Sequence, residues 1–180
     1  MKTNAIFLSL IFLFAFTACD ESGADKKALT YYNSYSEILQ SFTDDSQDIM
    51  EQINDIVQEN MVEGEGLELS STDSVKALGL LSDFKAIQAT ALQNLNALET
   101  FEDNDLKHTT VEYVDKSADI LHTIYLTKVL GLEELAPEDD DTDELLEELE
   151  KISDNIVNVQ KAFMNKYEIP IISEHEHHVH

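Results

Sequence analysis

Histidines gather at the C-terminal end of the chain. Four of the six histidines lie in the last six residues, where they alternate with Glu174 and Glu176; they are His175, His177, His178 and His180. Neutral imidazole nitrogens beside carboxylates suit Zn(II), Cu(II) or Ni(II). The composition predicts weak metal binding by the tail, residues 173–180, and a polar end without a metal is the alternative interpretation.

Cys19 is the only cysteine, and it directly follows a short apolar segment. Lys2 supplies a positive start, residues 6–14 are almost all apolar, and the small residues Thr17 and Ala18 precede the cysteine. A helix that crosses a membrane needs about 20 apolar residues, so this segment is typical of a secretion signal instead.

The four residues Phe16-Thr17-Ala18-Cys19 resemble the lipobox of bacterial lipoproteins, although Phe16 stands where that family usually has leucine. The resemblance implies that residues 1–18 are a lipoprotein signal peptide and that Cys19 carries acyl chains such as palmitate. Two or more acyl chains hold a protein firmly on a bilayer, so the membrane is an expected partner through the lipid anchor. The alternatives are an ordinary signal peptide with an unrelated cysteine, or a small buried cysteine.

Residues 19–27 form an acidic segment of small and polar residues, which we expect to be a flexible tether. Asp20 and Glu21 directly follow the cysteine, a pattern that resembles the surface-export signals of lipoproteins in Bacteroidota. The resemblance implies an outer-membrane protein exposed on the cell surface. A merely solvated linker is the alternative, with the protein facing the periplasm.

The charge of the chain excludes some partners. The 180 residues carry a formal net charge of −26, and all 11 basic side chains are lysines. Phosphate recognition relies on basic patches, so we expect no nucleic-acid partner. Anionic lipid headgroups would also repel this surface. With Cys19 acylated no disulfide can form, and the fold must rely on core packing.

Four segments place apolar residues three or four positions apart, the spacing of amphipathic helices. The first spans about residues 28–59, and Ser46 interrupts its stripe of Tyr31, Tyr35, Ile38, Phe42, Ile49, Ile53 and Ile56. The second spans about residues 73–99 after several candidate N-cap oxygens in 71–74. Its stripe is Ala77, Leu81, Phe84, Ala91, Leu95 and Leu98, widened by Val75, Leu78, Leu80 and Ile87.

The third and fourth stripes follow the same rule. The third begins at Leu106, contains the polar residues Thr110 and Ser117, and should stop at Gly131. The fourth ends before Pro170 and is the most regular, with Leu145, Leu149, Ile152, Ile156, Val159, Phe163 and Tyr167. Residues 28–172 are therefore predicted to form an all-α domain, an up-down-up-down antiparallel four-helix bundle about 40 Å long.

Other residues that could bind metals are less convincing. Two pairs of residues have the spacing of di-iron ligands: Asp105 with His108, and Asp119 with His122. About 21 Å of helix separates the two pairs, however, so they could not share a metal site. An acidic run reproduces part of a calcium loop, with Glu144 where that loop needs glycine; its members are Asp139, Asp141, Asp143 and Glu150. We expect no bound cofactor apart from a metal at the tail.

The combination of lipobox, acidic tether and helical domain resembles small helical surface lipoproteins of Bacteroidota without an assigned function. The resemblance implies a non-enzymatic envelope protein that binds a protein or glycan partner. The alternative is a metal-binding envelope lipoprotein that uses its C-terminal histidines. No catalytic constellation supports an enzyme.

Overall fold

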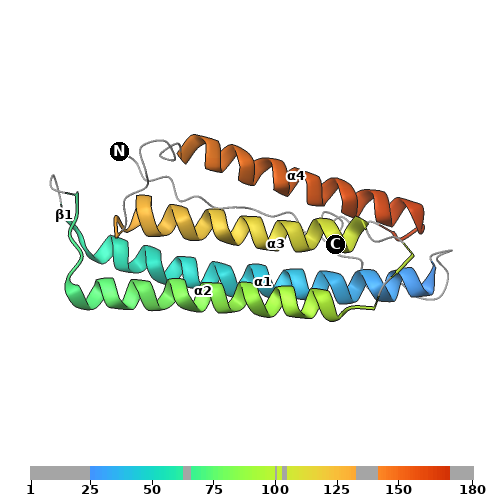
Figure 1. Ribbon diagram of the computed structural model, residues 1–180, viewed down its shortest axis with the longest axis horizontal. Coiled ribbons are helices and arrows are strands. Elements are labelled where there is room, and N and C mark those ends of the chain that lie inside the picture. Colours follow the sequence, from blue (N-terminus) through green and yellow to red (C-terminus); the bar gives the residue numbers. More distant parts are fainter. Residues whose placement is uncertain (1–24, 63–65, 100, 103–104, 133–141, 171–180) are drawn as a thin grey trace, which may run out of the picture.

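The computed structural model describes residues 25–62, 66–99, 101–102, 105–132 and 142–170. They form an all-α, up-down-up-down antiparallel four-helix bundle (Figure 1), which confirms the predicted fold class. Its elements are α1 (Lys26–Glu59), β1 (Met61–Val62), β2 (Gly66–Leu67), α2 (Ser71–Ala97), α3 (Asp105–Ile124), the π-helical turn η1 (Tyr125–Val129) and α4 (Thr142–Lys166).

Helix α1 begins at Lys26, inside the segment that was predicted to be tether. The reason is an N-cap: the Asp25 carboxylate accepts hydrogen bonds from the backbone N–H groups of Lys27 at 2.8 Å and Ala28 at 3.1 Å. The backbone N–H of Asp25 also donates to the carbonyl of Tyr167 at 3.3 Å. The end of α4 therefore helps to fix the start of α1.

A short antiparallel hairpin follows α1, and the sequence pattern did not predict it. Met61 pairs with Leu67, and Val62 pairs with Gly66. Gly66 has a positive φ of 102°, which favours glycine at this position. The carbonyl of Asn60 extends the pairing by accepting from the backbone N–H of Glu68 at 3.1 Å. Strands of two residues are too short to show an alternating pattern.

Side chains close both ends of α2. The N-cap is Ser70, just before the predicted candidates, and its hydroxyl accepts from the backbone N–H of Asp73 at 3.1 Å. At the other end the Lys107 ammonium donates to the carbonyls of Asn96 at 3.1 Å and Leu98 at 2.8 Å. A cation placed on the last carbonyls of a helix also opposes the negative end of the helix dipole.

The third helix continues into a π-helical turn. The backbone N–H of Leu130 donates to the carbonyl of Tyr125 at 2.9 Å, five residues back. Gly131 then takes a left-handed φ of 61°, and the N–H of Leu132 donates to the Leu126 carbonyl at 3.0 Å. Gly131 is thus the helix stop that the sequence predicted.

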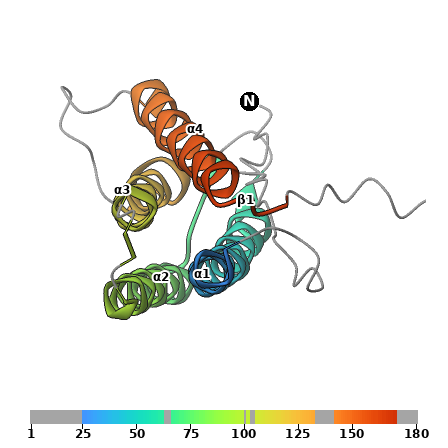
Figure 2. The ribbon, with the colours of Figure 1, turned by 90° about the vertical axis from the view of Figure 1, so that its right-hand side faces the viewer.

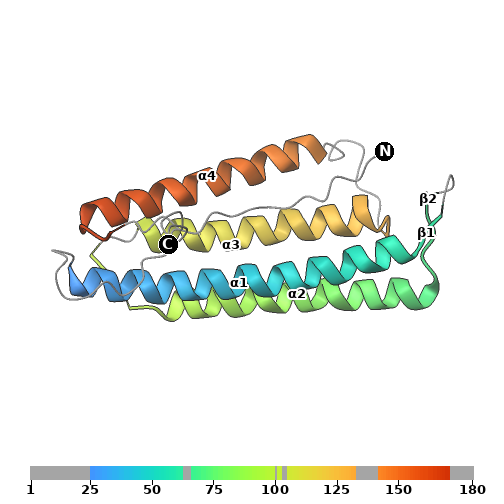
Figure 3. The same cartoon turned by 180° about the vertical axis from the view of Figure 1, so that it is seen from behind.

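Helix α4 is inclined to the other three. Neighbours in sequence pack along each other, and α4 packs closely along α3. Figures 1 and 2 show that the end of α4 lies closer to α1 than its beginning does, and the reverse view in Figure 3 agrees. A small second core therefore forms between α3 and the start of α4, from Ile120, Ile124 and Leu149.

The predicted stripes supply the main core. Leu149, Ile156 and Phe163 are buried as expected, and so are most predicted positions of α1. Two residues expected to widen the α2 stripe are exposed instead: Val75 at 71% and Leu78 at 46%. They lie on the side of α2 that faces away from α1, α3 and α4, so their prediction as core residues is wrong.

An aromatic cluster joins α4 to the first turns of α1. The Phe163 ring lies 6.0 Å from the rings of Tyr31 and Tyr32, 5.8 Å from that of Phe101 and 4.7 Å from that of Tyr167, measured between centroids. Aromatic pairs at such distances contribute about 0.5–1.5 kcal/mol each beyond the area they bury.

Polar side chains also lie inside the bundle. The Gln160 amide donates to the Tyr35 hydroxyl at 3.1 Å, and Thr110 donates to the Leu106 carbonyl at 2.6 Å. Ser46 and Ser117, the two serines that interrupt the predicted stripes, are both buried. These residues keep the helical spacing of the stripes although they are polar.

The stripe of α4 makes a prediction about stability. Phe163→Ala should lower the free energy of unfolding by about 3–5 kcal/mol and Ile156→Ala by about 2–5 kcal/mol, because each leaves a cavity in a packed core. Asn155→Ala, at an exposed position of the same helix, should change it by less than about 0.5 kcal/mol. Urea unfolding followed by circular dichroism measures all three. Equal stability of the Phe163→Ala and Asn155→Ala proteins would contradict the core assignment.

The buried tyrosines predict a loss of stability at alkaline pH. Burial raises the pKa of Tyr32 to about 12, partly offset by a hydrogen bond with Ser36, and burial also raises the pKa values of Tyr35 and Tyr113. The folded state holds these protons longer than the unfolded state does. The contribution of the buried tyrosines to the free energy of unfolding is therefore complete below pH ~10, the ordinary tyrosine pKa. It falls as the pH rises toward about 12.

Ultraviolet absorbance of phenolate, recorded together with circular dichroism, tests this expectation. The buried tyrosines should ionise only as the helical signal disappears. Full ionisation near pH ~10 with an intact helical signal would show that they are accessible to water.

Candidate binding groove between the first two helices

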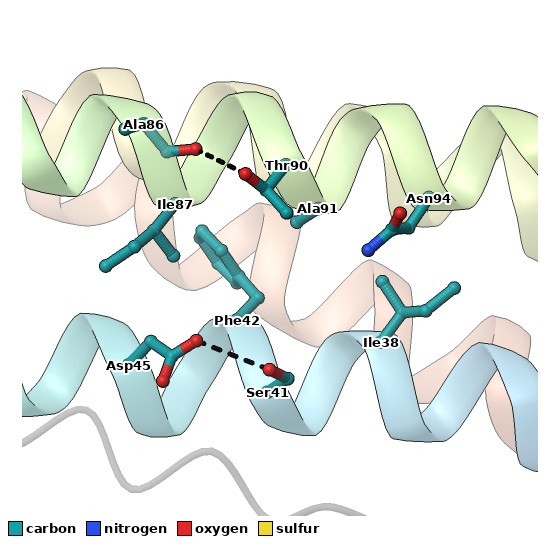
Figure 4. Close-up of a pocket in the computed structure, with 9 residues that line it drawn as sticks. All are labelled: Ile38, Ser41, Phe42, Asp45, Ala86, Ile87, Thr90, Ala91 and Asn94. Carbon is teal, nitrogen blue, oxygen red and sulfur yellow. Dashed lines mark hydrogen bonds between the residues drawn. The ribbon is translucent and has the colours of Figure 1, made fainter.

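A groove runs between α1 and α2 on the outside of the bundle (Figure 4). Its volume is about 230 Å³. Helix α1 contributes four lining residues and α2 contributes five; they are Ile38, Ser41, Phe42, Asp45, Ala86, Ile87, Thr90, Ala91 and Asn94.

The groove has an apolar floor and a polar rim. Phe42 and Ala91 are buried at its base, and Ile38 and Ile87 are half-buried on its two sides. At the rim the Ser41 hydroxyl donates to the Asp45 carboxylate at 3.3 Å, and Thr90 donates to the Ala86 carbonyl at 2.9 Å. The hollow exists because the α2 residues that face α1 here include two alanines.

The lining residues support binding better than catalysis. Ser41 and Asp45 are a hydroxyl and a carboxylate one turn apart, but no lining residue is a histidine, cysteine or lysine that could activate that hydroxyl. An apolar floor with a few polar groups at its edge is the usual composition of a recognition site.

Helix α2 has an outer face unlike those of the other long helices. Of its fifteen exposed residues only Lys76 and Asp83 are charged, whereas nine of fourteen are charged on α1 and nine of thirteen on α4. A row at helical spacing runs along this face, and we call it the outer row; it consists of Val75, Gly79, Ser82, Ala86, Ala89 and Gln93. Ala86 belongs to both the row and the groove.

On the side facing α3, polar contacts fix α2 in place. Lys85 forms a salt bridge with Asp119 and donates to the Gln88 side chain at 2.9 Å. The Gln88 amide donates to the carbonyl and to the carboxylate of Asp115, both at 3.1 Å. The Lys85 ammonium, with help from Gln88, lowers the pKa of Asp119. Asp119 thus stabilises the contact between α2 and α3.

Most of the other sequence-predicted site residues lie outside the part of the chain that the structure describes. Cys19, the histidines His175, His177, His178 and His180, and Asp139 and Asp141 lie outside the described residues. Asp143 and Glu150 are exposed on α4. Within the described ranges no three His, Cys, Asp or Glu side chains could hold a metal ion together. No helix in those ranges has the length and apolar character needed to span a membrane.

Sequence reasoning missed the groove, although a signal for it exists. Alanine and threonine recur on the exposed side of α2, where the other helices carry acids and lysines. No protein-family model matches the chain, and no curated protein or solved structure matches it significantly. The functional argument therefore rests on the residues of this chain.

Gly79 in the outer row yields a prediction. A Cβ at this position would meet no atom within 4 Å, so nothing within the described bundle requires glycine. Glycine inside a helix is about 1 kcal/mol less favourable than alanine, and Gly79→Ala should therefore raise the stability by about that amount. Thermal unfolding measures the change. A destabilised Gly79→Ala protein would show that the backbone at this position needs glycine.

Proposed function

We propose that this chain is a lipid-anchored, non-enzymatic protein of the bacterial envelope whose helical bundle binds a protein or glycan partner. The observation that carries the binding role is the groove between α1 and α2, with an apolar floor at Phe42 and a rim without catalytic groups. It is open to solvent, and it adjoins a helix face on which only Lys76 and Asp83 are charged, in a chain of net charge −26.

The anchoring part rests on the residues around Cys19. An apolar segment, two small residues and one cysteine match the lipoprotein pattern, and the acidic residues that follow favour display on the outer membrane. The acidic surface would be repelled by anionic headgroups, so attachment should depend on the lipid alone. Exposure on the cell surface is the expected location, and a periplasmic orientation is the alternative.

Metabolic labelling with palmitate tests the anchor. The parent protein should incorporate palmitate and enter the detergent phase, whereas Cys19→Ser should do neither. Cys19→Ser combined with Ser22→Cys restores a cysteine three residues later and should remain unlabelled, because processing requires the small residues directly before the cysteine. A soluble, unlabelled parent would disprove the anchor, and protease added to intact cells would distinguish surface display from a periplasmic location.

The C-terminal histidines favour a second candidate function, metal binding in the envelope. Imidazole binds a divalent metal only when neutral, so affinity should fall as the pH drops below ~6.5. Calorimetric titration with zinc, copper and nickel should show saturable binding to the full chain at neutral pH and none to a chain that ends at Ser173. Equal, weak uptake by both would mean that diffuse acidic charge attracts the metal, and would disprove the tail site.

A further inference from the structure

The groove and the outer row of α2 form one continuous surface. Ala86 lies in both, and the exposed Val75 and Leu78 are at the start of α2. Gly79, Ser82, Ala86 and Ala89 are all small and exposed. Side chains of this size allow a second helix to approach at the short end of the usual 8–10 Å interaxial range.

The borders of this surface differ in charge. Residues 28–59 of α1 contain seven acidic residues and no lysine, and Asp45 forms part of the groove rim. On the other border Lys85 is already held by Asp119 and Gln88 of the α2–α3 contact. Lys76 and Asp83 on the exposed side of α2 cancel in formal charge, so the net negative charge beside this surface comes from α1.

We propose that the surface binds an amphipathic α-helix of another protein, with small or aliphatic residues toward α2 and lysine or arginine along the edge that faces α1. This partner class rests on the proposed binding function and makes it specific. Helices that lie in grooves are recognised through their own apolar residues at positions i, i+3, i+4 and i+7. The exposed Val75 and Leu78 and the Phe42 ring at the groove floor are the apolar groups that such residues would contact.

Charge decides against two other occupants. A second copy of this chain would bring its own acidic α1 row up to the same surface, and seven of the fourteen exposed α1 residues are acidic. An anionic bilayer would meet the same repulsion. Opposite charge on a foreign helix instead speeds association and fixes its direction across the surface.

The experiment uses the full chain and a synthetic helical peptide with a leucine and alanine stripe and lysines on the remaining positions. Two control peptides accompany it. The first has the same composition in scrambled order, and the second has glutamate in place of every lysine. Fluorescence anisotropy measures the affinities at low and high salt. The lysine peptide should bind saturably, the scrambled peptide about ten-fold more weakly, and the glutamate peptide not at all.

Variants locate the binding surface. Ala86→Trp should block the groove and weaken binding about ten-fold or more, while Ala162→Trp, the same change at an exposed alanine of α4, should alter it less than about two-fold. Asp45→Asn with Asp48→Asn should weaken binding about three-fold and flatten its salt dependence. Glu150→Gln with Asp154→Asn removes equal charge from α4 and should have little effect. Circular dichroism confirms that each variant is folded.

Several results would overturn the proposal. Equal binding of ordered and scrambled peptides, or an Ala86→Trp protein that binds normally, would mean that only diffuse charge attracts the peptide. A full chain that is dimeric until Ala86→Trp dissociates it would assign the surface to a second copy. Loss of vesicle binding in Leu78→Ser would assign it to lipid.

Failure of palmitate labelling with intact peptide binding would disprove the lipid anchor and leave the proposed binding surface unaffected.

Discussion

Closure of the bundle depends on the contact between the end of α4 and the start of α1. The other neighbouring helices pack along their whole length, but α4 reaches α1 through the aromatic cluster around Phe163 and through the Gln160–Tyr35 hydrogen bond. The chain has no cysteine after Cys19, so no disulfide can hold this part of the bundle together. The inclination of α4 brings its end closest to α1, and large aromatic side chains fill the space between the two helices there.

The buried polar groups make that closure specific. Leucines alone would let α4 slide or rotate with little change in energy, whereas Gln160 must meet the Tyr35 hydroxyl or lose a hydrogen bond in a dry interior. Thr110 satisfies its hydroxyl differently, by donating to the Leu106 carbonyl of its own helix, so it needs no partner on another helix.

The sequence predicted the helices well because each one buries a regular stripe, and Leu149, Ile156 and Phe163 are buried as the spacing requires. The prediction failed where contacts between helices decide which side chains are buried. Val75 and Leu78 satisfy the spacing rule in sequence, yet they lie where no neighbouring helix covers them. The alanines and threonines of α2 mark an unusual face in the sequence, but the position of the groove depends on which side of α2 faces α1, and helical spacing alone does not give that.

The hydrogen bond between Asp25 and Tyr167 means that the chain enters and leaves the bundle at the same end. Five residues lie between Cys19 and Asp25. Six residue steps can span at most about 22 Å, so a lipid on Cys19 would hold this end near the bilayer. Helix α1 has 34 residues and extends about 50 Å from there, to the end where α2 begins with Val75 nearby. A partner helix lying on α2 between Ala86 and Val75 would then occupy the half of the bundle that points away from the membrane.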